Sequence, residues 1–413
     1  MASSRTVVVA GAGIGGLTAA LAIARHGYRV VVLEQAERLE EAGAGIQLSP
    51  NASRVLIALG LHRQLTAAQV STPEELVVAN GRSGRVLARA TLGLDVRRRY
   101  GAPYWVIHRG DLQAVLREAV EAHPDISLRL GCRADDFAAH GNGVTVAAHA
   151  GRETIEEHGI ALVGADGVWS RLRGRLGHEA PPRFAGYTAW RALVPADAVA
   201  CELSMPAVNL WLGGDGHVVY YPLRGGRVIN VVAIVRDDWR ETGWSAPGLR
   251  SEINARLEAR GWRGPPREIV AAAEGWFKWA LCDCAPLARW GRGAVTLLGD
   301  AAHPMLPYLA QGAAMAIEDA AELGACMAQD DAPAAAMRRY ERRRLTRTAR
   351  AQREARRNGA IYHMSGVAGL ARSLALAAMG GRRLVSRYDW VYSWTPPREG
   401  ETPSTASRQH AST

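Results

Sequence analysis

The first segment of the chain constrains the fold more strongly than any other. Residues 5–35 read RTVVVAGAGIGGLTAALAIARHGYRVVVLEQ, a β-branched run, a glycine turn, an alanine- and leucine-rich stretch and a second apolar run. The two apolar runs are typical of buried strands, and the segment between them has the length and composition of a helix. Together they predict one complete βαβ unit, which begins a parallel sheet.

The turn of this unit carries Gly11, Gly13 and Gly16 in the spacing GxGxxG, and Glu34 ends the second strand. Glycine allows a tight turn and lets backbone amides approach a pyrophosphate at the helix N-terminus, while the acid can hold a ribose hydroxyl. In this strand–turn–helix context the motif predicts an ADP-containing dinucleotide. NAD and FAD share the pattern, so the motif alone leaves both open.

Composition excludes several classes of partner. The formal charge is +10, but Lys278 is the only lysine, and the densest basic run, residues 338–357, has helical spacing and a single aromatic residue. We interpret that run as a solvent-exposed helix face rather than a nucleic-acid surface. The five scattered cysteines favour a reduced cytoplasm over a disulfide framework or a zinc site. No uninterrupted apolar run is long enough to span a membrane. A cytoplasmic protein without metal, membrane or nucleic acid is expected.

Three further motifs help to decide between NAD and FAD. Arg109 precedes a helix in HRGDLQAVL, Asp166 and Gly167 follow an apolar strand in ALVGADGVWSRLR, and Asp300 ends the strand AVTLLGD. In this order, and with the first motif, they resemble the group A flavoprotein aromatic hydroxylases, the family of para-hydroxybenzoate, salicylate and 3-hydroxybenzoate hydroxylases. The resemblance covers nearly the whole chain and is most specific in GDAAHPMLPYLAQGAAMAIEDA, residues 299–320.

The resemblance implies an α/β fold, in which a Rossmann-like FAD-binding domain of the glutathione-reductase type carries an inserted, mainly antiparallel substrate domain and a C-terminal helical region. Period-two alternation runs from Tyr187 to Val235, and the Gly225-Gly226 pair within it predicts a tight hairpin, which supports the antiparallel sheet. We assign residues 1–75, 100–180 and 285–360 to the FAD-binding domain, 76–99 and 181–284 to the substrate domain, 361–395 to the helical segment and 396–413 to a disordered tail.

The same resemblance implies tightly bound FAD, with NADH or NADPH as a transient co-substrate and O2 as the oxidant. Without it, Arg109 could be a surface ion pair, Asp166 a turn residue and Asp300 a helix cap. The residues expected at the cofactor are Gly11, Gly13, Gly16 and Glu34 at the ADP half, Arg109 at the pyrophosphate or ribityl region, Asp166 and Gly167 in the DG motif, Gly299 and Asp300 at the ribityl chain, and Pro304 in the adjoining loop.

The implied reaction hydroxylates a small aromatic substrate by way of a flavin C4a-hydroperoxide. If HVVYY is a strand, His217 and Tyr221 point to the same face. Histidine suits removal of a phenolic proton near neutral pH, although a hydrogen-bonded sheet histidine is the alternative. Both residues match substrate-contacting positions of the 3-hydroxybenzoate 6-hydroxylase branch, and Gln311 matches its active-site glutamine. His217, Tyr221 and Gln311 are therefore the catalytic candidates.

Several points stay open at this level. Arg191 could hold a substrate carboxylate or form a salt bridge beneath the sheet, His303 is expected to position the flavin loop, and Gln47 has no firm role. Cys284 stands where the family usually has an arginine after an aspartate. The alternative function is an FAD-dependent oxidoreductase or oxygenase acting on an N-heterocycle or a bicyclic natural product. The substrate, the choice between NADH and NADPH, and the state as monomer or homodimer are not determined.

Overall fold

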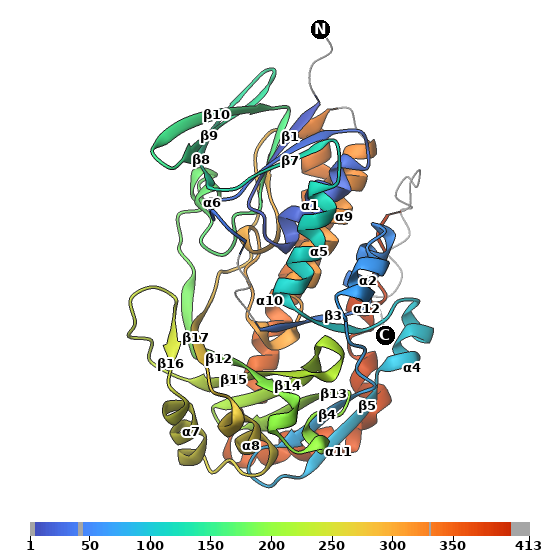
Figure 1. Ribbon diagram of the computed structural model, residues 1–413, viewed down its shortest axis with the longest axis vertical. Helices are drawn as coiled ribbons and strands as arrows, with labels where there is room; N and C mark the ends of the chain where they lie inside the picture. The colour runs from blue at the N-terminus through green and yellow to red at the C-terminus, as the bar shows by residue number, and fades with distance from the viewer. Residues whose placement is uncertain (1–4, 40–43, 330–331, 398–413) are drawn as a thin grey trace.

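The βαβ unit at the start of the chain forms the centre of a parallel sheet (Figure 1). In the computed structural model, which describes residues 5–39, 44–329 and 332–397, α1 (Ile14–Ala24) connects β1 (Thr6–Ala10) to β2 (Arg29–Leu33). The strand order is β18-β11-β1-β2-β7, and every neighbouring pair is parallel. The remaining strands are β7 (Ile126–Arg129), β11 (Ala161–Gly164) and β18 (Val295–Leu297).

Helices cover this sheet and complete the first core. The helix α1 packs against α5 (Arg109–Glu121) and α9 (Gly312–Gln329), so its alanine- and leucine-rich sequence is buried on nearly every side. A three-stranded antiparallel sheet of β8 (Cys132–His140), β9 (Gly143–Ala150) and β10 (Glu153–Gly159) adjoins it. The parallel arrangement brings the carboxyl ends of β1, β11 and β18 to one edge, where the motifs of the sequence converge.

The second layer is an eight-stranded, mostly antiparallel sheet, which lies below the first in Figure 1. Its order is β16-β17-β12-β15-β14-β13-β4-β5. The strands are β4 (Glu75–Asn80), β5 (Val86–Thr91), β12 (Arg183–Pro195), β13 (Ala207–Gly213), β14 (Gly216–Leu223), β15 (Val228–Arg236), β16 (Ser245–Gly248) and β17 (Trp276–Asp283). This sheet therefore combines two segments that are far apart in the sequence, β4–β5 and β12–β17. The hairpin expected at Gly225-Gly226 joins β14 to β15, and both glycines have positive φ.

Shorter elements connect the layers. The pair β3 (Gly45–Leu48) and β6 (Trp105–His108) forms a two-stranded ribbon near the junction. The short helices are α2 (Pro50–Ala58), α3 (His62–Ala67), α4 (Gly93–Tyr100), α6 (Arg171–Arg175), α7 (Arg250–Ala259) and α8 (Pro265–Ala272).

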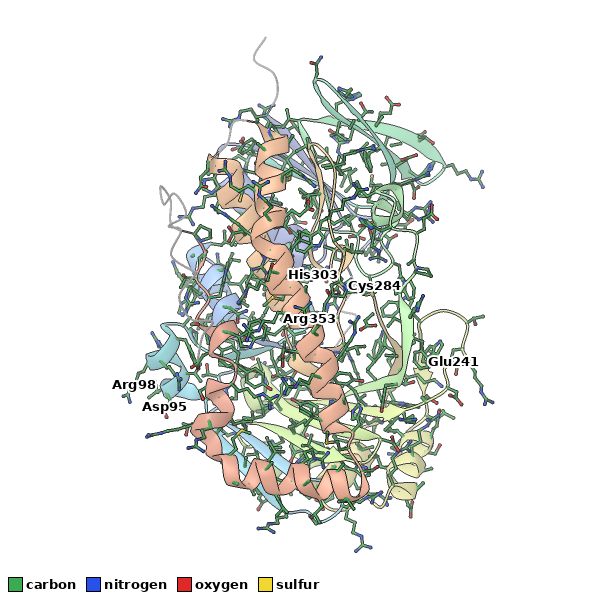
Figure 2. The ribbon with its side chains drawn as sticks, turned by 180° about the vertical axis from the view of Figure 1, so that it is seen from behind. Asp95, Arg98, Glu241, Cys284, His303 and Arg353 are labelled. Atoms are coloured by element: carbon green, nitrogen blue, oxygen red, sulfur yellow. The ribbon has the colours of Figure 1, made fainter. Side chains whose placement is uncertain are left out.

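The helix α10 (Pro333–Tyr362) ties the two layers together, and Figure 2 shows it passing along both, with Arg353 labelled on it. Its basic run has the solvent-exposed face that the sequence predicted, which includes Arg353 and Arg357, but the opposite side of the run is buried. Arg344 is 1% exposed and pairs with Glu318 and Asp319 of α9, because α10 packs directly against that helix. After α10, α11 (Gly366–Ser386) packs on β5, and α12 (Asp389–Tyr392) follows.

The predicted fold class is confirmed. Residues 158–163 are divided between β10 and β11, which pair in different sheets. The helix α7 begins at Arg250, because the residues before it pair with β17 as strand β16. Of the predicted disordered tail, residues 398–413 lie outside the described residues. Within the described part, none of the helices has the length and apolar character needed to cross a membrane.

Candidate active site

The glycine turn after β1 is shaped by close backbone packing. A Cβ on Gly11, whose φ is +109°, would lie 2.4 Å from the Ala165 carbonyl oxygen, and one on Gly16 would lie 1.9 Å from the Gly11 carbonyl oxygen. Gly13 has no neighbour within 4 Å of such a Cβ and faces a cavity. Gly11 and Gly16 therefore allow the turn to pack, while Gly13 leaves room for a ligand to approach the backbone.

The first cavity lies at the ends of β1 and β2 and has a volume of about 200 Å³. Glu34 lines it, and its carboxylate accepts hydrogen bonds from the amides of Ala12 (2.7 Å) and Ala36 (2.9 Å). These two bonds fix the carboxylate beside the glycine turn. The open backbone at Gly13 and this fixed acid fit the adenosine end of a dinucleotide.

Asp166 lies at the edge of the same cavity, but its carboxylate is engaged within the protein. It accepts hydrogen bonds from the Ser170 hydroxyl (2.6 Å) and from the amides of Arg171 (2.8 Å) and Leu172 (3.2 Å), at the start of α6. Burial raises its pKa, and these hydrogen bonds oppose that shift. Gly167, with φ +79°, borders both this cavity and the next. The DG motif thus shapes the wall chiefly through its backbone.

A larger cavity of about 320 Å³ shares Gly13, Ala165 and Gly167 with the first and lies between the two layers. Asp300 and Arg109 face it. Asp300 lies deep in the molecule, yet its side chain is open to the cavity, and burial raises its pKa. In the part of the chain that the structure describes, neither its carboxylate nor the Arg109 guanidinium has a hydrogen bond or ion pair.

Both side chains are open to the cavity and have no protein partner there, and a ligand with hydroxyl and phosphate groups would supply partners for both. The surface ion pair considered for Arg109 is not formed with any described residue. The cavity, the open glycine backbone and the two free charges therefore fit FAD, with Asp300 at the ribityl hydroxyls and Arg109 at the ribityl or pyrophosphate region.

The eight-stranded sheet forms the floor of this cavity. His217, Val219 and Tyr221 of β14 alternate toward it, as the predicted strand required. The register places Val219 opposite Val232 of β15, and Val232 opposite Arg191 of β12. Arg191 thus lies two strands from Val219, about 10 Å away across the sheet.

Arg191 has no anionic partner among the described residues. Its Nε is buried without a hydrogen bond, and its guanidinium lies 5.1 Å from the centre of the Trp279 ring. Burial and then Arg109 lower its pKa to about 10, so the side chain is still a cation at neutral pH. The salt bridge beneath the sheet, one of two interpretations of this residue, is absent from the described residues. What remains is a cation that faces the cavity.

His217 is buried and contacts a second histidine that the sequence gave no reason to single out. Its Nδ1 lies 2.9 Å from Nε2 of His363, and the two rings are stacked with centroids 5.1 Å apart. Burial, and then His363, lowers the pKa of His217 well below its usual value. His217 is therefore a neutral imidazole that lines the cavity, which is the state a general base requires.

Tyr221 and Gln311 complete the wall. Tyr221 is 2% exposed and packs against Gly45, where a Cβ would lie 2.7 Å from its ring. The Gln311 side chain donates to the Ser49 hydroxyl (2.8 Å) and accepts from the Asn51 amide (3.1 Å). These contacts leave little freedom for the Gln311 amide, so it shapes the cavity as a fixed group.

His303 and Pro304 do not line either cavity. The His303 Nε2 lies 2.6 Å from the Asp319 carboxylate, and the Pro304 carbonyl accepts from the Gln352 side chain (2.9 Å). Figure 2 places His303 beside α10, in the middle of the molecule. Both residues hold the loop between β18 and α9 against α9 and α10, which agrees with the positioning role expected for His303.

A smaller cavity of about 100 Å³ adjoins the main one, and sequence reasoning missed its aromatic wall. Gln47, His217 and Gln311 border both cavities. The Tyr104 hydroxyl donates to the Gln47 side chain (2.5 Å), which gives Gln47 a place in the wall. The segment RYDWVYSW supplies two of the tyrosines, and its aromatic density was the available signal. The tyrosines are Tyr104, Tyr308, Tyr362, Tyr388 and Tyr392.

The fold and these cavities are those expected of a flavoprotein. A family model described as "FAD binding domain" matches residues 4–355. The chain belongs to this family of FAD-dependent monooxygenases.

Individual relatives agree with this assignment. The chain is 37% identical over 387 residues to 3-hydroxybenzoate 6-hydroxylase 1 of Aquipseudomonas alcaligenes, covering 94% of this chain and 97% of that protein. It is similar in structure to a salicylate hydroxylase substrate complex, with a TM-score of 0.80, 26% identity and coverage of 96% and 97% of the two chains. Klebsiella pneumoniae HpxO complexed with FAD and uric acid gives a TM-score of 0.82, 27% identity and coverage of 94% and 96%.

Proposed function

We propose that the protein hydroxylates a small aromatic acid that already carries a ring hydroxyl, using NAD(P)H and O2. The observation that carries this proposal is the cavity floor, which presents a neutral histidine, His217, and an unpaired cation, Arg191, on one face of the sheet. A benzoate-sized molecule with its carboxylate at Arg191 can reach His217 with its hydroxyl, because the two backbones are two strands and two residues apart, about 12 Å, and both side chains face the cavity.

The residues on the two sides of the cavity have different roles. On the parallel-sheet side, Asp300 and Arg109 would hold FAD, which supplies hydride acceptance from NAD(P)H and the activation of O2 when bound. On the other side, Arg191 would orient the substrate. His217 would accept the proton of the ring hydroxyl at Nε2, which makes the ring more nucleophilic.

Exclusion of water is the second task of the wall. Val219, Val232 and Ile234 give the floor an apolar surface between the two polar residues, and Pro307 and Ala310 cover it from the loop before α9. Tyr221 packs against the Gly45 backbone, which closes the gap toward β3. A dry cavity favours transfer of oxygen to the substrate over loss of the activated oxygen as hydrogen peroxide.

A substrate screen tests this proposal. Holoenzyme is mixed with NADH or NADPH and with 3-hydroxybenzoate, salicylate or a hydroxynicotinate, and NAD(P)H oxidation and product mass are measured. The expected result is stimulated oxidation with a product heavier by one oxygen atom. Benzoate and phenol are matched controls, since each lacks one of the two anchored groups.

A second candidate is oxygenation of an N-heterocycle without a carboxylate. It is favoured by the similarity to HpxO, whose complex contains uric acid. Stimulation by uric acid together with no response to any hydroxylated acid would support this alternative and overturn the assignment of Arg191 to a carboxylate.

We also infer that the enzyme works in the cytoplasm, as a monomer or a homodimer. All five cysteines are free thiols, which is usual in a reducing compartment. Size-exclusion chromatography with light scattering would determine the oligomeric state, and a larger assembly would contradict this inference.

A further inference from the structure

A buried histidine contacts the cavity histidine from behind. His363 is the residue after the last turn of α10, and its Nε2 lies 2.9 Å from the His217 Nδ1. His217 lines both the 320 Å³ cavity and the 100 Å³ cavity, whereas His363 lines neither of them. The pair therefore leads from the cavity into the protein on its far side.

The hydrogen bond between the two rings restricts their protonation. Two imidazole nitrogens at this distance need one proton between them. Burial keeps His217 neutral, so it has only one N–H. If Nδ1 carries that proton and donates it to His363, the lone pair of Nε2 is free to accept a proton from the cavity. No hydrogen bond to His217 Nε2 exists within the described residues.

His363 lies one layer below the surface. The Tyr187 ring stacks on it with centroids 4.4 Å apart, and its carbonyl accepts from the Asp215 amide (3.2 Å). The Asp215 carboxylate pairs with Arg236 at 3.0 Å, and these side chains are 46% and 65% exposed. Burial lowers the pKa of His363 to about 4, and the Asp215 carboxylate opposes that shift. A proton on His363 is thus close both to a carboxylate and to water.

The position of His363 is held by another helix. Arg372 of α11 donates from Nη1 to the carbonyls of Tyr362 (2.6 Å) and Ile361 (3.3 Å), which belong to the last turn of α10.

The charged and titratable groups around the histidine pair come from six elements or turns. They are Tyr187 of β12, Asp215 of the β13–β14 turn, Arg236 of β15, Tyr308 before α9, Tyr362 of α10 and Arg372 of α11.

We propose that His363 is the second member of a proton relay that carries the substrate's hydroxyl proton from His217 to the surface beside Asp215. The proposal rests on the proposed function, since it requires a substrate with an ionisable hydroxyl. The substrate O–H bond breaks as the His217 Nε2–H bond forms. The His217 Nδ1–H bond breaks as the His363 Nε2–H bond forms, and His363 releases its Nδ1 proton to water. When the product oxygen takes a proton back from His217 Nε2, the same transfers run in reverse from water and restore both starting tautomers, so charge and protons balance.

The relay explains how a deeply buried base can act repeatedly. An imidazolium at His217 would be an unpaired buried cation, which burial strongly disfavours. Passing the proton to His363 moves the positive charge toward the Asp215 carboxylate. His363 is therefore a positioning and relay residue, because it acts through His217 and does not line the substrate cavity.

The tautomer of His217 in the free enzyme tests the relay without any substrate. Histidine-selective 15N NMR of the holoenzyme is assigned with the variants His217→Ala and His363→Gln. The relay requires His217 to be protonated at Nδ1. Protonation at Nε2, with His363 as the donor to His217, would overturn the proposal, because the cavity nitrogen would then have no lone pair to accept a proton.

Proton release on substrate binding provides the second test. Oxidised holoenzyme is mixed with 3-hydroxybenzoate in weakly buffered solution that contains a pH indicator. His363→Gln keeps an acceptor for the His217 N–H but cannot pass a proton on, so release is expected to slow by about tenfold or more. FAD content and the dissociation constant of the ligand should change by less than about threefold. The exposed histidine variant His62→Gln is the matched control and should behave as wild type.

The outcomes separate the two proposals. If His363→Gln releases protons as fast as wild type, His363 merely orients His217 and the relay is wrong. If wild type binds none of the hydroxylated acids and is stimulated by none, the proposed function fails, while the NMR result still decides whether His217 has the tautomer that the relay requires.

Discussion

Two sets of charged side chains in this molecule differ in how they are paired. Between α9 and α10, Glu318, Asp319, Arg344 and Arg347 are fully paired, with contacts of 2.6 to 2.7 Å. Around the main cavity, Asp300, Arg109 and Arg191 have no ionic partner among residues 5–39, 44–329 and 332–397. The paired carboxylates are buried, whereas Asp300 and Arg109 are open to the cavity, so the first set indicates a scaffold and the second indicates where ligands bind.

The paired set also holds the site in place. The Asp319 carboxylate accepts from the Gly299 amide (3.1 Å) and contacts His303 (2.6 Å), while Asn51 links Glu318 (2.6 Å) to Gln311 (3.1 Å). Burial alone would raise the pKa of Asp319, but His303 and Arg344 overcome it and hold the pKa at about 2. The scaffold therefore stays charged throughout the physiological range and fixes both ends of the loop that precedes α9.

Breaking the paired set should have the largest effect. Arg344→Ala removes one cationic partner from each of two buried carboxylates and is expected to lower the free energy of unfolding by about 3 to 5 kcal/mol. Urea denaturation of the FAD-bound protein measures it. Arg89→Ala, which removes an exposed pair with Glu75, is the control and should cost at most about 1 kcal/mol. A loss of that small size for Arg344→Ala would show that the cluster is not a scaffold.

His217 and His363 differ from both sets of charged side chains, because they are buried as neutral groups. The pKa of His363 is lowered from 6.5 to about 4, so between these values the unfolded chain binds a proton that the folded chain rejects. Stability should therefore fall as the pH falls from 6.5 to about 4, by about 1.4 kcal/mol per pKa unit and roughly 3 kcal/mol in all. His363→Gln should flatten this dependence in denaturation at several pH values. Parallel curves for the two proteins would refute the assignment.

Removing an unpaired charge should affect ligand binding instead of stability. Asp300→Ala eliminates a charge without a protein partner, so the apoprotein should be as stable as wild type or more so. FAD affinity should fall by about 10- to 100-fold, which corresponds to the loss of one hydrogen bond to a charged group. Flavin retention on ultrafiltration measures this, with exposed Asp95→Ala as the control (Figure 2). Full retention of FAD would remove Asp300 from the cofactor site.

The smallest effect is expected at the substrate side. Arg191→Met should leave FAD content unchanged and raise KM for the aromatic acid by about tenfold, equivalent to about 1.4 kcal/mol of lost binding. Arg191→Lys retains the cation and should recover part of the affinity. Steady-state kinetics with the acid and with its carboxamide separate charge from shape. Equal KM values for wild type and Arg191→Met would contradict a carboxylate at this position.

The sequence predicted the parts of this molecule that depend on local backbone geometry. The glycine turn after β1, the strand that precedes Asp300 and the alternation that puts His217 and Tyr221 on one face all follow from short-range rules, because each is a local pattern of residue types. The fold class followed from the order of these motifs.

The remaining parts depend on contacts between distant segments. His363 meets His217 across 146 positions of sequence, and nothing near either residue indicates the pair. Cys284, where the family usually has an arginine, is instead contacted from α10, since Arg356 donates to its carbonyl (2.7 Å) and pairs with Asp283 (2.6 Å). The buried side of the basic run on α10 was not predicted for the same reason, because the acidic partners of Arg344 lie on α9.

Product formation by His217→Ala tests the central claim most directly. The variant is compared with wild type on the best aromatic acid from the screen, with FAD content and ligand binding measured in parallel. A neutral histidine that accepts the ring hydroxyl proton predicts a fall in hydroxylated product of about 100-fold or more, with FAD content unchanged. Product formation within a few-fold of wild type would contradict the account.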